Sequence, residues 1–220
     1  SADRKTGTVD YESAYERFWK ASELDPKFHQ AHYNAGWTAE QISRFADAER
    51  HYRSAYDIEG NTDYLLALAD TLTQNDKSAE SVELYKSYLS STDDKSIRYK
   101  LIEAMTTAAQ YDDAINQIQQ ILLTEPKDIK AYQLLSRVYF VQDMFDMSLL
   151  CAEKANEFAE GDPGISNNMG VTYLAMEDST TALVTFKEIV EKNPDHLAAN
   201  LNLGYIALNS GDFGLAQARF

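Results

Sequence analysis

The sequence predicts an all-α protein built as a solenoid of antiparallel helix pairs. A large residue recurs every 33 or 34 residues, and a small residue stands four positions before each large one. The 220 residues contain nine glycines, four prolines and few runs of β-branched residues, so helices are favoured over strands. Helix pairs of this kind bury their apolar faces only against neighbouring pairs, so the chain grows unit by unit without one central core.

The repeat is clearest over residues 163–196, a unit of 34 residues. We expect Asp162 to cap its first helix, with Pro163 in the first turn, where a missing N–H has no cost. Phe186 lies in the apolar stripe of the second helix. This helix ends before Pro194, because proline disfavours helical geometry in the residue that precedes it.

The same register continues through nearly the whole chain. The large residue of each second helix is Phe18, Tyr52, Tyr85, Ile118, Ala152, Phe186 or Phe220. The small residue before it is Ala14, Ala48, Ser81, Ala114, Ser148, Ala182 or Ala216. An aromatic residue recurs in the turn between helices at Phe45, Tyr111, Phe145 and Phe213. With Gly170, Tyr173 and Pro194 in the clearest unit, this pattern resembles the tetratricopeptide repeat (TPR) family.

The resemblance implies a right-handed superhelix, in which small residues at Gly36, Gly170 and Gly204 let paired helices approach closely. It places a single TPR solenoid of about six units over residues 11–220. The expected boundaries are a half unit at 11–27, full units at 28–61, 62–94, 95–128, 129–162 and 163–196, and a partial unit at 197–220. The unit 62–94 matches least well, since Leu68-Ala69 replaces the usual Leu-Gly.

Both ends of the sequence suggest a fragment of a larger chain. Residues 1–10 have no helical periodicity and are expected to be a flexible lead or a cloning scar. The first residue is Ser1, and the last predicted second helix is cut short at Phe220. Solenoids need polar capping helices for solubility, so we expect an uncapped apolar end through which two copies can associate.

The charge balance excludes some classes of partner. The chain has 35 acidic and 20 basic residues, a net charge of −15. Nucleic acids and anionic membranes are bound through basic surfaces, so neither is an expected partner. We also expect no membrane insertion, since no stretch approaches the roughly 20 apolar residues of a spanning helix. Cytoplasm and bacterial periplasm both fit this composition, because the single Cys151 allows no internal disulfide.

No catalytic or metal-binding constellation is predicted. His29 and His32 share one helix face but have no third ligand in phase, so packing is favoured over a metal site. His51 and Cys151 stand at the same repeat position in units three apart, too distant to form a Cys–His pair. The sequence has no glycine-rich phosphate loop. We therefore expect a non-enzymatic chain without cofactor or metal.

The family resemblance also implies where a partner binds. In TPR proteins the first helices line a concave groove. The corresponding residues here are Tyr33, Asn34, Trp37, Tyr99, Lys100, Glu103, Thr106, Lys130, Gln133, Arg137, Phe140, Asn167, Asn168, Val171, Leu174, Asn202, Tyr205 and Asn209. The aromatic members are of the type enriched at energetic hot spots of interfaces.

Two features of this set suggest what the groove binds. Lys100, Lys130 and Arg137 place basic groups on adjacent units, where they could receive a carboxylate or acidic side chain. The alternative is that the first and third only pair with Glu103 and neighbouring acids.

Asn34, Asn168 and Asn202 share one repeat position and could hold an extended peptide backbone. This arrangement resembles the TPR arms that guide peptides into protein glycosyltransferases. The alternative is that each asparagine ties together its own helices. The lysines of the chaperone-binding TPR clamp are absent, and Gln133 stands where the first would be.

These observations favour a non-catalytic scaffold that binds a peptide or helix of a partner protein. One alternative is the substrate-recognition arm of a larger enzyme such as a protein glycosyltransferase. Another is a self-assembling structural module of a bacterial envelope or motility complex, because residues 140–174 and 196–220 are similar to TPR proteins of those systems. That similarity also favours a bacterial source.

Overall fold

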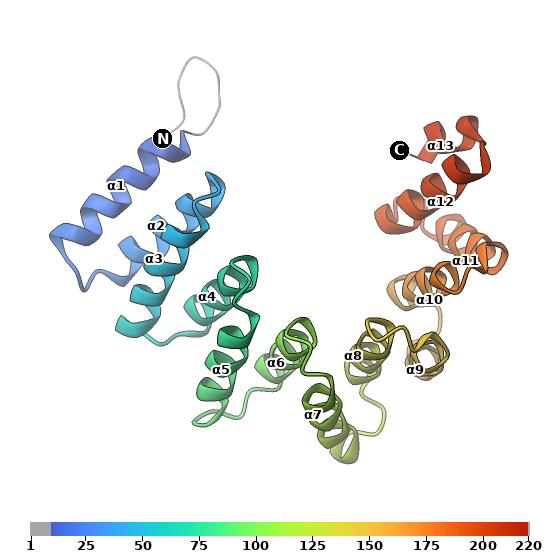
Figure 1. The fold of residues 1–220 in the computed structure, drawn as a ribbon, viewed down its shortest axis with the longest axis horizontal. Coiled ribbons are helices and arrows are strands. Elements are labelled where there is room, and N and C mark those ends of the chain that lie inside the picture. Colours follow the sequence, from blue (N-terminus) through green and yellow to red (C-terminus); the bar gives the residue numbers. More distant parts are fainter. Residues whose placement is uncertain (1–9, 220) are drawn as a thin grey trace. The chain divides into compact units, whose positions relative to one another are not determined.

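The structure, a computed structural model, describes residues 10–219, and every regular element among them is an α-helix (Figure 1). The predicted all-α helical repeat is therefore confirmed. Of the expected lead at 1–10, only Asp10 is described, and its side chain caps the first helix by accepting from the Ser13 backbone N–H at 3.0 Å. The rest of that lead lies outside the described residues, as does Phe220.

The helices form two compact units, the first ending at Gln110 and the second beginning at Tyr111. The first contains α1 (Tyr11–Leu24), α2 (His29–Gln41), α3 (Phe45–Ile58), α4 (Thr62–Gln74), α5 (Ser78–Leu89) and α6 (Lys95–Thr107). The second contains α7 (Tyr111–Thr124), α8 (Ile129–Phe140), α9 (Phe145–Phe158), α10 (Pro163–Ala175), α11 (Ser179–Lys192), α12 (Leu197–Ser210) and α13 (Phe213–Arg219). The division falls between the two helices of the predicted unit 95–128.

The turns between paired helices share one backbone conformation. The residue with positive φ is Ser43, Asp76, Ala109, Asp143, Glu177 or Gly211, so it recurs every 33 or 34 residues. Only glycine adopts this left-handed region without steric cost, and five of the six are not glycine. The spacing of these turns is therefore a second indication of the repeat, in addition to the large and small residues.

Two glycines explain how closely paired helices approach. A Cβ added to Gly36 in α2 would lie 2.8 Å from ring atoms of Tyr52 in α3. A Cβ added to Gly170 in α10 would lie 2.6 Å from the ring of Phe186 in α11. Carbon atoms do not approach this closely without displacement. Each glycine is thus the socket for the large residue of its partner helix, as the resemblance implied.

The apolar cores follow the predicted register. In the first unit, Tyr52 packs with Tyr15, Ala48 and leucines of α4. In the second, Phe186 packs with Ala182 and with Leu203 of α12. In the first helix of the chain Tyr15 and Ser22 are buried, the predicted large residue Phe18 is half-buried, and Leu24 is 80% exposed.

Polar side chains fix several helix starts. As expected, Asp162 accepts from the Ile165 backbone N–H at 2.9 Å, with Pro163 as the first residue of α10. Asp128 caps α8 and Asp178 caps α11 in the same way. Each cap satisfies a backbone donor that the helix itself leaves without a partner. The caps Asp128 and Asp162 therefore fix the starts of α8 and α10, the two helices between which the site lies.

Candidate functional site

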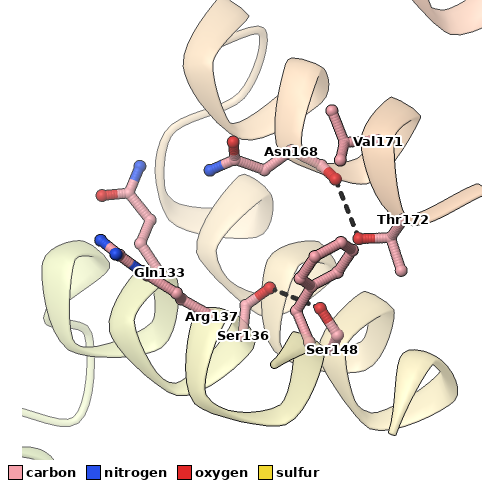
Figure 2. A pocket seen from close by; sticks show the side chains of 8 residues that line it. Gln133, Ser136, Arg137, Ser148, Asn168, Val171 and Thr172 are labelled. Carbon is pink, nitrogen blue, oxygen red and sulfur yellow. Dashed lines mark hydrogen bonds between the residues drawn. The ribbon is translucent and has the colours of Figure 1, made fainter. Parts of the chain in front are cut away.

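A pocket of about 340 Å³ opens between α8 and α10 in the second unit. Its lining residues are Gln133, Ser136, Arg137 and Phe140 from α8, Ser148 from α9, and Asn168, Val171 and Thr172 from α10. Figure 2 shows Gln133 and Arg137 reaching out from α8, Asn168 and Val171 on α10, and the two serines deeper in. Five of the predicted groove residues are thus brought together.

The deeper hydroxyl groups are already satisfied. Ser136 and Ser148 share a hydrogen bond between their Oγ atoms at 3.0 Å, and Thr172 donates to the Asn168 carbonyl oxygen at 2.9 Å. All three hydroxyl-bearing residues are buried. Sequence reasoning did not place them in the groove, although Ser148 stands at the small-residue position of the repeat. They form a polar floor that needs no ligand.

The Arg137 guanidinium supplies the charge of this pocket. It is exposed, and no hydrogen bond or ion pair joins it to another residue in the part of the chain that the structure describes. The amide groups of Gln133 and Asn168 lie at the same opening and can both donate and accept. Phe140, packed against Phe145 with ring centroids 5.7 Å apart, and Val171 add apolar surface. Together these groups suit a carboxylate beside an apolar side chain.

The other predicted basic residues have different surroundings. Lys100 belongs to the first unit, where its Nζ lies 3.1 Å from the Glu103 carboxylate on the same helix. This is the pairing that the sequence analysis gave as the alternative to ligand binding. Lys130 is exposed at the start of α8 and does not line the pocket. Of the three basic residues, Arg137 alone lines this pocket.

The three asparagines that share a repeat position do not share one environment. Asn168 is exposed at the pocket. The Asn202 side chain on α12 donates to Asn167 Oδ1 on α10 at 3.1 Å, so these two amides join neighbouring repeats. Asn34 is half-buried, and its carbonyl oxygen accepts from Thr38 at 2.7 Å. Repeat register therefore predicts which face an asparagine lies on, but not its partner.

The remaining groove candidates divide between the two units. Tyr33 and Trp37 line a separate pocket in the first unit. Tyr99 lies under Lys95, with Nζ 5.6 Å from the ring centroid. Tyr205 is 57% exposed on α12. Thr106 is buried and donates to the Ile102 carbonyl oxygen, so it offers nothing to a ligand.

Histidine and cysteine side chains are occupied in packing. Burial raises the pKa of the Cys151 thiol to about 11, which leaves it an unreactive apolar group. His29 bonds Tyr64 at 2.7 Å and pairs with Glu59 at 2.8 Å, while His32 contacts His51, with 3.4 Å between their Nδ1 atoms. Among residues 10–219, no three histidine, cysteine or acidic side chains form a group that could hold a metal ion.

Comparison with known proteins finds tetratricopeptide repeats in two parts of the chain. A family model described as tetratricopeptide repeat matches residues 10–63 and 167–218. The chain contains tetratricopeptide repeats. The crystal structure of a TPR protein from Parabacteroides merdae ATCC 43184 superposes with a TM-score of 0.72 at 16% identity, covering 96% of this chain and 84% of that one. PilW, a type IV pilus biogenesis factor, has a TM-score of 0.60 at 15% identity, covering 86% and 89%. At these identities the TPR fold is what is shared.

A curated relative is considerably longer. Protein O-mannosyl-transferase TMTC1 of Homo sapiens is 22% identical over 197 residues, which cover 87% of this chain and 22% of that protein. This chain therefore spans less than a quarter of that relative's length. No helix among the described residues is long and apolar enough to cross a membrane.

Proposed function

We propose that this TPR chain is a non-catalytic scaffold that binds a peptide or helix of a partner protein along its first helices. The observation that carries the proposal is the pocket between α8 and α10. It combines the unpaired Arg137 guanidinium with two amides and apolar surface. A partner segment with an acidic side chain or terminal carboxylate beside an apolar residue suits this chemistry.

The absence of a catalytic role is part of the same proposal. The pKa of Cys151 is raised and that of His51 is lowered, and burial of the side chain is the largest cause in both cases. A catalytic group would have to meet substrate, and these side chains face other helices. At the pocket floor Ser136 and Ser148 bond each other, and Thr172 donates to the Asn168 carbonyl oxygen, so neither bond pairs a hydroxyl with a basic side chain.

The substrate-recognition arm of a larger enzyme is a second candidate. It is favoured by the similarity to an O-mannosyl-transferase, of which this chain matches only a part. In such an arm the same pocket would guide an acceptor polypeptide, and the catalytic residues would lie elsewhere. The sequence of the complete gene separates the two candidates, because a glycosyltransferase domain in the same reading frame is expected only for the second.

Self-association through the ends of the solenoid, and the bacterial source and fragment character expected from the sequence, remain predictions. Leu197 on α12 and Phe213 on α13 are more than two-thirds exposed, which suits an apolar contact between copies. Sedimentation equilibrium tests this directly. A mass that rises with concentration would support self-association, and a monomer at all concentrations would exclude it.

Peptide selection tests the main proposal. We would select from a random peptide library without lysine and arginine, displayed on phage, and then titrate the selected peptides by calorimetry at 0.15 M salt. The selected peptides are expected to carry Asp or Glu next to an apolar residue. Arg137→Glu should weaken their binding at least tenfold, about 1.4 kcal/mol.

Lys187→Glu is the matched control, since it makes the same change of charge on an exposed part of α11 outside the pocket. It should alter binding less than twofold. Equal losses in both variants would mean that net charge, and not the pocket, governs binding. A library that yields no binding peptide would contradict the proposed function.

A further inference from the structure

A second pocket, of about 410 Å³, lies in the first unit between α2 and α4. It is lined by Tyr33, Trp37 and Glu40 from α2, Tyr52 from α3, and Asp63, Leu66, Ala67, Asp70 and Gln74 from α4. α2 and α4 are the first helices of successive repeats (Figure 1). The pocket thus occupies the same place in its repeats as the Arg137 pocket does between α8 and α10.

The charge of this pocket is entirely negative. Glu40, Asp63 and Asp70 line it, and none of its nine lining residues is lysine, arginine or histidine. Lys100 acts on Asp70 from α6, but its own ion pair is with Glu103. Desolvation raises the pKa of Asp70, Lys100 opposes this shift and Glu103 adds to it. A cation entering the pocket would therefore meet three carboxylates, of which Lys100 offsets only Asp70.

The Glu40 carboxylate is held in a fixed position. Tyr52 donates to its Oε2 at 2.8 Å, and the Thr71 hydroxyl, which has one proton, lies 2.9 Å from its Oε1 and 2.8 Å from the Ala67 carbonyl oxygen. Tyr52 and Thr71 are both buried. A carboxylate that is positioned before its ligand arrives loses little conformational entropy on binding. Each of its oxygens has a further lone pair for a second donor.

An aromatic wall faces these acids and is an observation independent of them. Trp37 is 44% exposed, and its ring makes a T-shaped contact with that of Tyr11 at 5.6 Å between centroids. Tyr33 is fixed between Tyr52 and Tyr64, with centroid distances of 5.4 and 5.0 Å. The faces of tryptophan and tyrosine attract ammonium and guanidinium groups. The exposed Trp37 ring and the half-buried Tyr33 ring beside carboxylates therefore favour a cation with an apolar stem.

We infer that the pocket of the first unit binds a lysine or arginine side chain of a partner polypeptide. The side chain's stem packs on Trp37, and its cationic head meets Glu40, Asp63 and Asp70. Charge complementarity and the aromatic wall together select this occupant over an apolar or acidic one. The inference extends the proposed function to a second site and a second class of partner residue.

Nuclear magnetic resonance of the full chain tests the inference, because one of its two tryptophans lines the pocket. The probes are heptapeptides of alanine and glycine with one central arginine or lysine, acetylated and amidated so that they carry no carboxylate. A third peptide replaces arginine by citrulline, which has nearly the same shape without charge. The arginine and lysine peptides should shift the Trp37 indole N–H resonance saturably. The citrulline peptide and the Trp19 resonance should show no such shift.

Two variants locate the interaction. Asp63→Asn and Asp70→Asn should each weaken binding about fivefold, as expected for one charge-assisted contact near a surface. Asp57→Asn, an exposed change of the same charge on α3 outside the pocket, should alter it less than twofold. Equal binding of the citrulline peptide, or equal loss in all three variants, would overturn the inference. Since the probes carry no carboxylate, this result is independent of the Arg137 pocket, and either site can fail while the other stands.

Discussion

The pockets of the two units have the same place in the repeat but opposite chemistry. In the second unit, Arg137 stands with two amides over a floor of satisfied hydroxyls. In the first, three carboxylates face Tyr33 and Trp37. The sockets at Gly36 and Gly170 hold the two helices of a repeat together, and each pocket lies between the first helices of successive repeats. Of the lining side chains only Tyr52 fills one of these sockets, so the others can differ from one pair of repeats to the next.

The units also differ in how the scaffold is linked to the pocket. Tyr52 and Phe186 occupy one repeat position, and each ring lies over a glycine. The tyrosine carries a hydroxyl that holds Glu40 at 2.8 Å, whereas phenylalanine has no polar atom to offer. In the first unit the core residue therefore contributes to the pocket directly. In the second, the core and the charged opening are separate.

Acidification is expected to give the largest difference between the units. His51 is buried in the first unit beside the Tyr15 ring, with ring centroids 5.9 Å apart. Burial, with Arg50 and His32 adding and Asp47 opposing, lowers its pKa from 6.5 to about 4. The folded state thus disfavours the proton that the unfolded state accepts. The neutral His51 therefore contributes about 3 kcal/mol to the free energy of unfolding above pH 6.5, and this contribution is lost as the pH falls towards 4.

Urea unfolding between pH 7.5 and 4.5, followed by circular dichroism, measures this loss. The comparison is with His51→Leu, which removes the titrating group and a buried Nε2 that has no partner among the described residues. The variant should lose clearly less stability on acidification than the parent. If both lose stability equally, His51 does not cause the pH dependence, and this distinction between the units fails.

A smaller effect is expected from Tyr52→Phe. The change removes the hydrogen bond to Glu40 and leaves the ring in place, so the free energy of unfolding should fall by about 1–2 kcal/mol. Binding of the arginine peptide should weaken as well, since Glu40 loses a fixing contact. Thermal melts and the Trp37 resonance measure the two effects. Tyr205→Phe, on an exposed ring of α12, should change neither measurably, and a similar loss there would contradict the proposed link between core and pocket.

Much of the fold could be predicted from the sequence because packing repeats. The large residues at Tyr52, Tyr85 and Phe186 are buried as their register required. The left-handed turn at Glu177 could not be predicted, since glutamate does not favour that conformation. The packing of α10 against α11 on either side holds the turn. The conformation of a turn cannot be predicted from its own residue when the packing of the flanking helices determines it.

The candidate site was predictable only in part. Arg137 and Asn168 followed from repeat position, because the first helices present the same face in each unit. Glu40 and Asp70 were missed, although Glu40 stands one helical turn after Trp37. An acidic residue on a helix of a chain with net charge −15 usually means a solvated surface. Only the structure places these acids together with the aromatic rings.

Charge selectivity of the two pockets is the central claim, and one spectrum of the full chain can test it. The arginine heptapeptide and a glutamate peptide of the same length and blocking groups would be titrated in turn at 0.15 M salt. The reporters are the Trp37 indole N–H and the Asn168 side-chain amide, assigned with Trp19→Phe and Asn168→Asp variants. We expect the arginine peptide to shift the Trp37 resonance alone and the glutamate peptide to shift the Asn168 resonance alone. Shifts of both reporters by both peptides would contradict it, because the pockets would then not select by charge.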